Sequence, residues 1–190
     1  MFELQRPKGP IPPARAAYPD GYRFRPARPE EAAACSRVTG IPVAENERRF
    51  AAGDACYVVE RDGLVVLVQW VHDGPCYVRG LGYVHDGAPD ERYVYGVVTD
   101  PAHRGRGLFR NALEHLDATL FSEGASRLVQ IVMAGNTPVL KTFSRLGYRA
   151  THDLRSVLVL GVRWTVVTPV GRESGRRSWR IAAPPGRFVI

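Results

Sequence analysis

The hydrophobic residues of this chain recur with two different periods, which predicts a fold that mixes strands and helices. Residues 56–60 and 64–72 are predicted strands, joined by a tight turn at residues 61–63. Residues 108–121 repeat instead at helical spacing, and Gly124 is expected to end this helix. Its apolar face carries Phe109, Ala112, Leu113, Leu116 and Leu120.

Proline, glycine and acidic residues mark the boundaries of the other elements. These are a short strand at 22–25, helices at 29–38, 44–52 and 136–146, and strands at 92–99, 127–133, 157–160, 163–167 and 179–182. Weak strands at 76–78 and 83–84 suggest an additional hairpin. From residue 92 the order is strand, loop, helix, strand, helix, strand. That order is typical of a βαβ crossover, so we predict an α/β fold of the mixed α+β kind.

The 190 residues suit one domain with a substantial core. Residues 1–21 are rich in proline and glycine, so they are expected to form an extended N-terminal arm. Residues 22–168 are the predicted folded domain. Residues 169–190 are expected to add a basic loop and a last strand that packs on the same domain.

The composition is that of an ordinary soluble protein, with 45% apolar and 24% charged residues. No apolar run is long enough to span a bilayer, and the first residues lack the apolar core of a signal peptide. We therefore expect a cytoplasmic protein without a membrane partner. Cys35, Cys56 and Cys76 are odd in number and form no C-x-x-C pair, which favours buried free thiols over disulfides or a metal site.

The formal net charge is +7, and the 26 basic residues include only two lysines, Lys8 and Lys141. This arginine bias, together with abundant Ala, Gly and Pro, suggests a GC-rich bacterial genome. A basic chain attracts polyanions such as nucleic acid, an anionic cofactor or an acidic partner protein. Because the charge is spread along the chain and no nucleic-acid motif occurs, we expect no nucleic-acid partner.

The most informative segment is residues 97–109, V-V-T-D-P-A-H-R-G-R-G-L-F. A strand leads into a glycine-containing loop that opens a helix, so several backbone N–H groups converge and the helix dipole adds positive charge. Gly105 and Gly107 allow the backbone to approach a bulky diphosphate, and Arg104 and Arg106 supply charge and forked donors. The segment therefore predicts an anion site.

Two better-known phosphate loops do not fit this segment. A Walker loop needs Lys and then Ser or Thr after its last glycine, where this chain has Leu108 and Phe109. A dinucleotide fingerprint needs a third glycine, and Arg110 occupies that place.

The segment V-V-T-D-P-A-H-R-G-R-G-L resembles the V-x-P-x-x-R-G-x-G loop of the GCN5-related N-acetyltransferase (GNAT) family. A second segment, with Asn136, Phe143 and then Leu146-Gly147-Tyr148, resembles the N…Y…L-G-F segment of that family. The resemblance covers residues 22–168 in element order and residues 91–148 at motif level. It implies a central mixed sheet, flanked by helices and splayed open between the strands at 92–99 and 127–133.

The resemblance also implies acetyl-CoA as the acyl-donor substrate, with no metal. The pantetheine arm would pair with the backbone of residues 97–99 like an added strand, and the pyrophosphate would lie on the N–H groups of residues 104–109. The cofactor-binding residues expected in this way are Val97, Val98, Thr99, His103, Arg104, Gly105, Arg106, Gly107, Leu108, Phe109, Asn136 and Phe143.

Two positions depart from the family pattern. Phe109 stands where the loop usually has Gly or Ala, and it falls on the apolar face of its helix. Phe143 stands where many members carry a tyrosine that protonates the leaving thiolate. Since Phe has no proton to donate, the thiolate must be protonated by another group or by water, or be stabilised by the helix N-terminus.

The implied reaction is direct attack of a neutral amine on a thioester, so a base or a chain of water molecules must remove a proton from the amine. Glu91 lies thirteen residues before Arg104, where some members place a glutamate base; the alternative is a solvated turn. Tyr93 and Tyr95 are expected on one strand face, where they would line the acceptor pocket or only pack. His72, His85 and His103 are weaker candidates.

These observations favour an acyl-CoA-dependent N-acyltransferase that transfers acetyl to a primary amine of a small molecule in a ternary complex. The alternatives are a longer acyl-CoA or an acidic acyl carrier protein as donor, or a CoA-binding sensor without turnover, which the missing tyrosine motivates. The apolar stretch 157–167 leaves a homodimer open.

Overall fold

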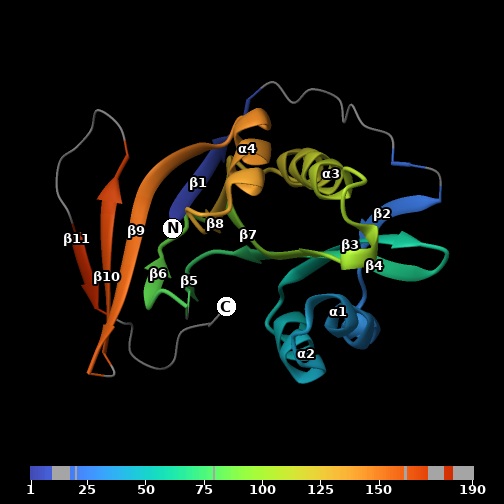
Figure 1. Cartoon of the computed structure of the whole chain (residues 1–190), viewed down its shortest axis with the longest axis horizontal. Coiled ribbons are helices and arrows are strands. Elements are labelled where there is room, and N and C mark those ends of the chain that lie inside the picture. Colours follow the sequence, from blue (N-terminus) through green and yellow to red (C-terminus); the bar gives the residue numbers. More distant parts are fainter. Residues whose placement is uncertain (10–17, 20, 79, 161, 171–177, 182–190) are drawn as a thin grey trace. The chain divides into compact units, whose positions relative to one another are not determined.

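The computed structural model describes residues 1–9, 18–19, 21–78, 80–160, 162–170 and 178–181. The chain divides into two compact units, drawn in Figure 1. The first unit comprises Met1–Pro7, Asp73–Tyr93 and Ser126–Ile190, and the second comprises Lys8–His72 and Val94–Ala125.

The second unit is built on antiparallel strands β2 (Tyr22–Pro26), β3 (Ala55–Arg61) and β4 (Leu64–Asp73), with the second half of β7 (Glu91–Thr99) beside β4. Its helices are the short η1 (Pro29–Glu31), α1 (Ala32–Thr39), α2 (Val43–Ala51) and α3 (Leu108–Ser122), and η2 (Pro101–His103) precedes α3. Figure 1 shows α3 on one side of β3 and β4, and α1 and α2 on the other.

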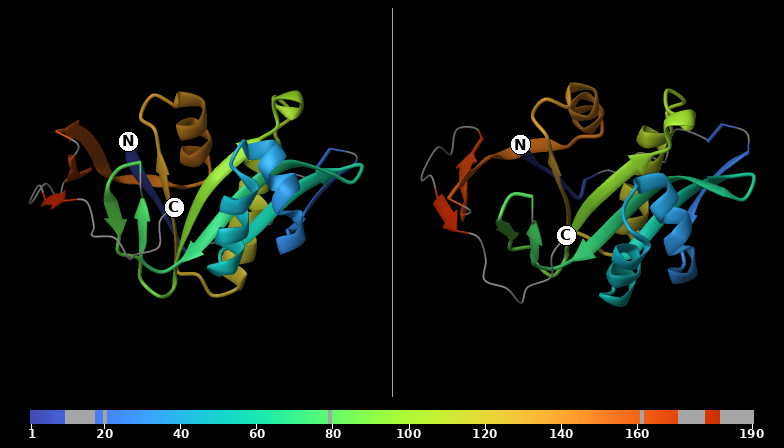
Figure 2. Two further views of the ribbon diagram at one scale, coloured as in Figure 1. Left: turned by 90° about the horizontal axis from the view of Figure 1, so that it is seen from below. Right: turned by 60° about the horizontal axis from the view of Figure 1, so that its bottom comes forward.

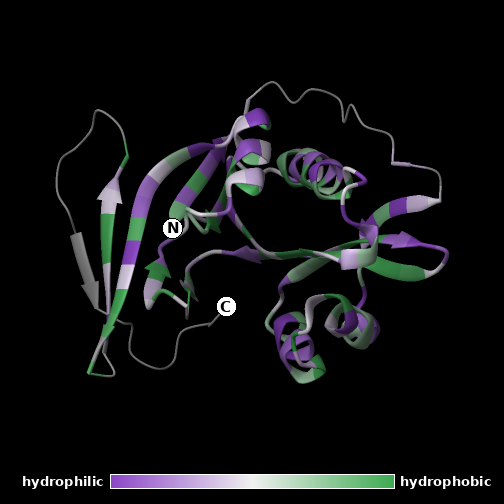
Figure 3. Ribbon diagram, viewed as in Figure 1, coloured by the Kyte–Doolittle hydropathy of each residue, from purple (hydrophilic) through white to green (hydrophobic). Residues whose placement is uncertain are grey.

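Alternating residues of β3 and β4 form the two interfaces of this unit. On the α3 side, Leu108 and Ala112 pack with Val59 and Leu67 in one hydrophobic cluster. On the α1 and α2 side, the ring centroid of Phe50 lies 4.7 Å from that of Trp70, and Cys35 Sγ lies 3.9 Å from Cys56 Sγ. Both faces of β4 are therefore covered, which explains its nearly continuous apolar run (Figure 3).

The first unit contains the strands β11 (Ser178–Ile181), β10 (Val162–Pro169), β9 (Arg149–Val159), β1 (Phe2–Pro7) and β8 (Arg127–Val132), in that spatial order. All these pairs are antiparallel, whereas the first three residues of β7 pair in parallel with β8. Helix α4 (Thr137–Arg145) follows β8, and β5 (Cys76–Val78) and β6 (Tyr83–His85) form a separate hairpin (Figure 2). Leu81, Tyr83, Leu154 and Val167 form a core cluster.

The prediction of an N-terminal arm is wrong for residues 2–7. These residues form β1, which pairs with both β8 and β9 and buries Glu3 and Leu4. The prediction rested on the proline and glycine content of the whole segment, and it overlooked a short stretch of alternating apolar and polar residues before the first proline. The remainder of the expected arm lies largely outside the described residues.

The other predicted elements are present, with one large difference in length. Strand β9 begins at Arg149, eight residues before the predicted start, because polar residues such as His152 and Asp153 also pair in the sheet. The predicted mixed sheet with flanking helices is confirmed, and Cys35, Cys56 and Cys76 are buried free thiols as expected. Among the described residues, no helix is both long and apolar enough to cross a membrane.

Candidate active site

The predicted site residues divide between the two units. The first unit contains Glu91, Tyr93, Asn136 and Phe143, and the second contains Tyr95 and all of residues 97–109. Each group of predicted site residues therefore has its structural context within one unit.

In the second unit, the turn after β7 is fixed by Asp100. Its carboxylate accepts a hydrogen bond from the backbone N–H of Ala102 (3.0 Å), and its own N–H donates to the carbonyl of Val66 (2.9 Å). Asp100 thus caps η2, as its position before a proline predicts, and sends the chain into the glycine loop.

The loop between η2 and α3 adopts a backbone that requires glycine. Gly105 and Gly107 both have φ of +76°, and beyond their chain neighbours no atom of the described residues lies within 4 Å of the place where a Cβ would stand. Gly107 is the N-cap of α3 and has no side chain with which to cap it. The first turn of α3 therefore presents backbone N–H groups beside open space, which suits an anion.

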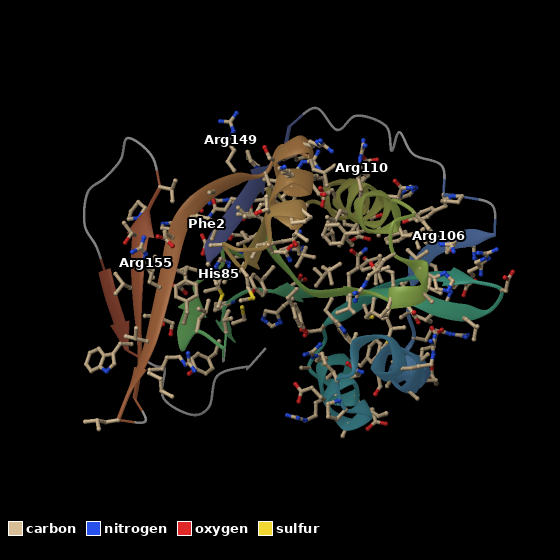
Figure 4. All side chains as sticks on the ribbon, in the orientation of Figure 1. Phe2, His85, Arg106, Arg110, Arg149 and Arg155 are labelled. Atoms are coloured by element: carbon tan, nitrogen blue, oxygen red, sulfur yellow. The ribbon has the colours of Figure 1, made fainter. Side chains whose placement is uncertain are left out.

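The side chains of the loop differ in their roles. Arg104 is exposed and donates from Nε to the carbonyl of Thr99 (3.1 Å). Arg106 is exposed and has no hydrogen-bond or ion-pair partner in the described part of the chain (Figure 4). His103 Nδ1 lies 2.9 Å from the hydroxyl of Tyr22, which anchors the loop to β2. Leu108 is buried in the core, so it can contribute only its backbone to a ligand.

The family segment around α4 lies in the first unit. Asn136 is exposed at the N-cap of α4, and its N–H donates to the carbonyl of Met133 (2.9 Å). Phe143 is 1% exposed, and its ring meets that of Tyr148 edge-on at 4.9 Å. Both rings line an apolar cavity of about 440 Å³ between α4, β1 and β9.

Glu91 lies in a polar cavity of about 320 Å³ in the first unit. Its carboxylate is buried, with Oε1 at 3.0 Å from His85 Nε2 and Oε2 at 3.8 Å from Arg127 Nε. Asp90 next to it is exposed. The solvated-turn alternative therefore describes Asp90 but not Glu91.

A second buried carboxylate, Glu3, faces the same cavity from β1. It accepts hydrogen bonds from Tyr83 (3.1 Å) and Gln5 (2.9 Å), and His152 Nδ1 lies 3.0 Å away. Burial alone would raise the pKa of Glu3, but hydrogen bonds from His85 and Gln5 and the charge of His152 lower this pKa to about 2.

The low pKa of Glu3 predicts a stability that depends on pH. Because the folded pKa of about 2 lies below the ordinary 4.5, ionised Glu3 stabilises the fold above pH 4.5, and this contribution is lost as the pH falls toward 2. We expect Glu3→Gln to remove about 3 kcal/mol from the free energy of unfolding at neutral pH. Urea unfolding at several pH values checks this, and a wild-type–variant difference that stays constant with pH would contradict it.

The two tyrosines of β7 belong to different clusters. The ring centroid of Tyr93 lies 5.5 Å from that of His85 in the first unit, whereas the Tyr95 hydroxyl donates to Asp54 in the second. Burial raises the pKa of both tyrosines, so both stay protonated near neutral pH. Each can donate a hydrogen bond but cannot act as a base; a shared acceptor pocket remains a prediction.

Two polar residues and one glycine around Tyr95 were not predicted from the sequence. Asp54 is fully buried and accepts from His72 Nδ1 at 2.7 Å as well as from Tyr95. The guanidinium of Arg49 lies over the ring of Tyr95, 5.1 Å from its centroid. Gly96 has φ of +59° in the middle of β7, and a Cβ there would stand 3.3 Å from Trp70. An isolated glycine within a strand pattern is a known signal for such a close approach.

The comparison with known proteins indicates the same family as the glycine loop between η2 and α3. Residues 24–148, well over half of the chain, match the profile of the Acetyltransferase (GNAT) family. The chain belongs to the GNAT family of acetyltransferases, and the predicted family is confirmed.

Two curated relatives are mycothiol acetyltransferases. That of Catenulispora acidiphila is 28% identical over 166 residues, which cover 78% of this chain and 50% of that protein. That of Corynebacterium glutamicum is 36% identical over 92 residues, which cover 46% of this chain and 29% of that protein. The chain therefore spans half or less of the length of these relatives.

Solved structures show the same fold at low identity. A GNAT-family protein of Novosphingobium aromaticivorans has a TM-score of 0.56 at 21% identity, covering 78% of this chain and 60% of that one. The protein yncA of Salmonella typhimurium, solved with its cofactor acetyl-CoA, has a TM-score of 0.54 at 18% identity, covering 82% and 98%. Within the described residues, no group of His, Cys, Asp or Glu is arranged to hold a metal ion.

Proposed function

We propose that this chain is an acyl-CoA-dependent N-acyltransferase that transfers acetyl from acetyl-CoA to a primary amine of a small molecule in a ternary complex. The glycine loop carries the proposal. In a chain of the GNAT family, a strand ends at a loop with two positive-φ glycines, open space beside them and an uncapped helix N-terminus. Strand β1 and residues 22–168 are the proposed transferase domain of a bacterial, cytoplasmic enzyme.

The loop fits the anionic part of acetyl-CoA. The backbone from Arg104 to Phe109 would hold the pyrophosphate, with Arg106 as an uncommitted cation beside it, because backbone donors and arginine forks both match phosphate oxygens. The backbone of residues 97–99 would bind the pantetheine arm as an added strand. Bound acetyl-CoA would supply the activated thioester carbonyl.

Glu91 is the proposed proton acceptor for the attacking amine. A cationic ammonium is not nucleophilic, so a nearby base must take its proton. Glu91 faces a cavity, and its carboxylate is held by His85 and Arg127 on either side. Tyr93 and Tyr95 are proposed to line the acceptor side as hydrogen-bond donors, in keeping with their raised pKa values.

The curated relatives, both named mycothiol acetyltransferase, support acetyl as the group that is transferred. Two alternatives remain distinct proposals. In the first alternative, the acyl donor is a longer acyl-CoA or an acidic carrier protein, which the net charge of +7 would attract. In the second, the chain binds CoA without turnover; the buried Phe143, which stands in the tyrosine position of the family, motivates this alternative.

Calorimetric titration with acetyl-CoA, butyryl-CoA and free CoA, followed by thiol release with a panel of primary amines, tests the proposal. We expect a Kd for acetyl-CoA in the range of about 1–100 μM and thiol release with at least one amine. Tighter binding of butyryl-CoA would favour the longer donor. Binding without thiol release would favour the sensor, and no binding to any of the three would overturn the acyl-CoA assignment.

A further inference from the structure

Arg49 is a buried cation on α2 whose position is fixed by two aromatic rings. Its side chain is 9% exposed, and its guanidinium carbon lies 5.4 Å from the ring centroid of Trp70 and 5.1 Å from that of Tyr95. Tyr95 is itself held by Asp54, which also binds His72. The guanidinium is therefore held in a rigid, preorganised setting.

The hydrogen-bonding capacity of Arg49 is not met by the described part of the chain. Its Nε and Nη1 are buried and have no hydrogen-bond partner there. Glu45 Oε1 lies 3.8 Å from Nε, beyond hydrogen-bond distance, and the same carboxylate pairs with Arg48. One carboxylate thus serves two guanidiniums, and a buried N–H without an acceptor is costly.

Two neighbouring groups share this deficit. Among the residues that the structure describes, the buried Nε1–H of Trp70, which packs against Arg49, has no acceptor, and the buried Oδ1 of Asn46, one helical turn before Arg49, has no donor. The unmet groups are therefore three donors and one acceptor, around a positive charge. A ligand that meets them must bring acceptor oxygens and negative charge.

The site lies close to the strand proposed to hold the acyl donor. A Cβ at Gly96 would stand 3.6 Å from Arg49 Nη1, and only glycine at this positive φ allows that approach without strain. Gly96 directly precedes residues 97–99. Two strand residues span about 7 Å, so a group bound at Arg49 lies within a few bond lengths of an acyl group held along residues 97–99.

We infer that Arg49 recognises an acidic group, a carboxylate or a phosphate monoester, on the acceptor, so that the substrate is an amine with an acid a few bonds away. This inference rests on the proposed acyltransferase function. Arg49 binds the acid group, Trp70 supplies a further donor, and the amine is directed toward the acyl donor. Arg49 is accordingly a specificity-determining residue.

Matched pairs of amines test this. Each pair differs only in the acid group: γ-aminobutyrate with butylamine, L-alanine with ethylamine, and O-phosphoethanolamine with ethanolamine. We expect the acid-bearing amine of at least one pair to have a kcat/KM at least about tenfold higher than the neutral amine of that pair, because the neutral amine cannot form the charge-assisted hydrogen bond to Arg49. The carboxylate and phosphate pairs show which acid is preferred.

The variants Arg49→Met and Arg48→Met assign the preference to one residue. Arg48 lies on the same helix and pairs with the same glutamate, but its side chain is 69% exposed. We expect Arg49→Met to reduce the preference to less than about threefold, through a loss of kcat/KM for the acid-bearing amine, and Arg48→Met, outside the proposed site, to keep both the preference and the kcat/KM values of wild type. Equal loss for both amines of a pair, or no preference in wild type, overturns the inference.

A binding experiment keeps the test independent of turnover and of folding. In a background with Trp164→Phe and Trp179→Phe, the fluorescence of Trp70 reports directly on this site. We expect butyrate or inorganic phosphate to change it saturably, and Arg49→Lys, which keeps the charge but loses the fork, to weaken that response. No saturable response to either anion overturns the inference even if acetyl-CoA binds, whereas failure to bind acetyl-CoA overturns the proposed function instead.

Discussion

Gly107→Val is expected to raise the Kd for acetyl-CoA at least about 100-fold, a loss of about 2.7 kcal/mol. Gly107 is the N-cap of α3, and its missing Cβ leaves open the space beside the first helical turn. A valine there would place a branched side chain where a diphosphate must approach the backbone N–H groups. Isothermal titration with acetyl-CoA measures the effect.

Gly63→Val is the matched control for this substitution. Gly63 has the same φ of +76° and the same open surroundings, but it lies in the turn between β3 and β4. Both variants incur the strain of a branched residue in the left-handed region, so their melting temperatures should fall by similar amounts. Only Gly107→Val should weaken binding. If Gly107→Val binds acetyl-CoA with wild-type affinity, or if both variants lose affinity equally, the loop is not part of the proposed donor site.

The glycine loop could be predicted because everything that forms it is local. The end of β7, the capping aspartate, the two glycines and the apolar face of α3 lie within about 25 consecutive residues, and each follows a short-range rule of turn or helix formation. The side chains around the loop were less predictable. The partner of His103 is Tyr22, which lies 81 residues away in the sequence.

The surroundings of Glu91 depend on contacts that no local pattern contains. Glu3 reaches Tyr83 and His152 across 80 and 149 residues, and β1 was itself predicted to be an arm. The sequence placed a carboxylate at the start of β7, but it left burial and exposure as equal alternatives. The pairing of β1 with β9 brings Glu3 and His152 to this cavity, and His85 reaches it from β6.

The Arg49 cluster was missed for a related reason. The sequence predicts only a short helix at residues 44–52, and it gives no sign that Arg49 and Asn46 are buried. A buried polar residue indicates a ligand site only when its hydrogen-bond partners can be counted, and they can be counted only once the fold is known. Gly96 was the one available signal, because a glycine inside a strand of β-branched and aromatic residues often marks a close approach.

Glu91→Gln is expected to lower kcat by about 100- to 1000-fold with the best amine, the range of a lost general base. Glutamine keeps the shape of the side chain and its contact with His85, but it cannot accept a proton from the amine. Because the proposed donor site is the loop after β7, the Kd for acetyl-CoA should remain within about twofold of wild type. Steady-state thiol release and calorimetric titration measure the two quantities on the same preparation.

Asp90→Asn provides the comparison, because it neutralises the adjacent carboxylate, which is exposed. Its kcat should stay close to that of wild type, since an exposed carboxylate outside the cavity has no proton to accept from a bound amine. A merely structural role for Glu91 would lower the melting temperature of Glu91→Gln without a comparable loss of kcat in the folded protein. If Glu91→Gln keeps a kcat within about threefold of wild type, Glu91 is not the base. The next candidate is then the buried pair of His72 and Asp54 beside Tyr95, which His72→Gln tests.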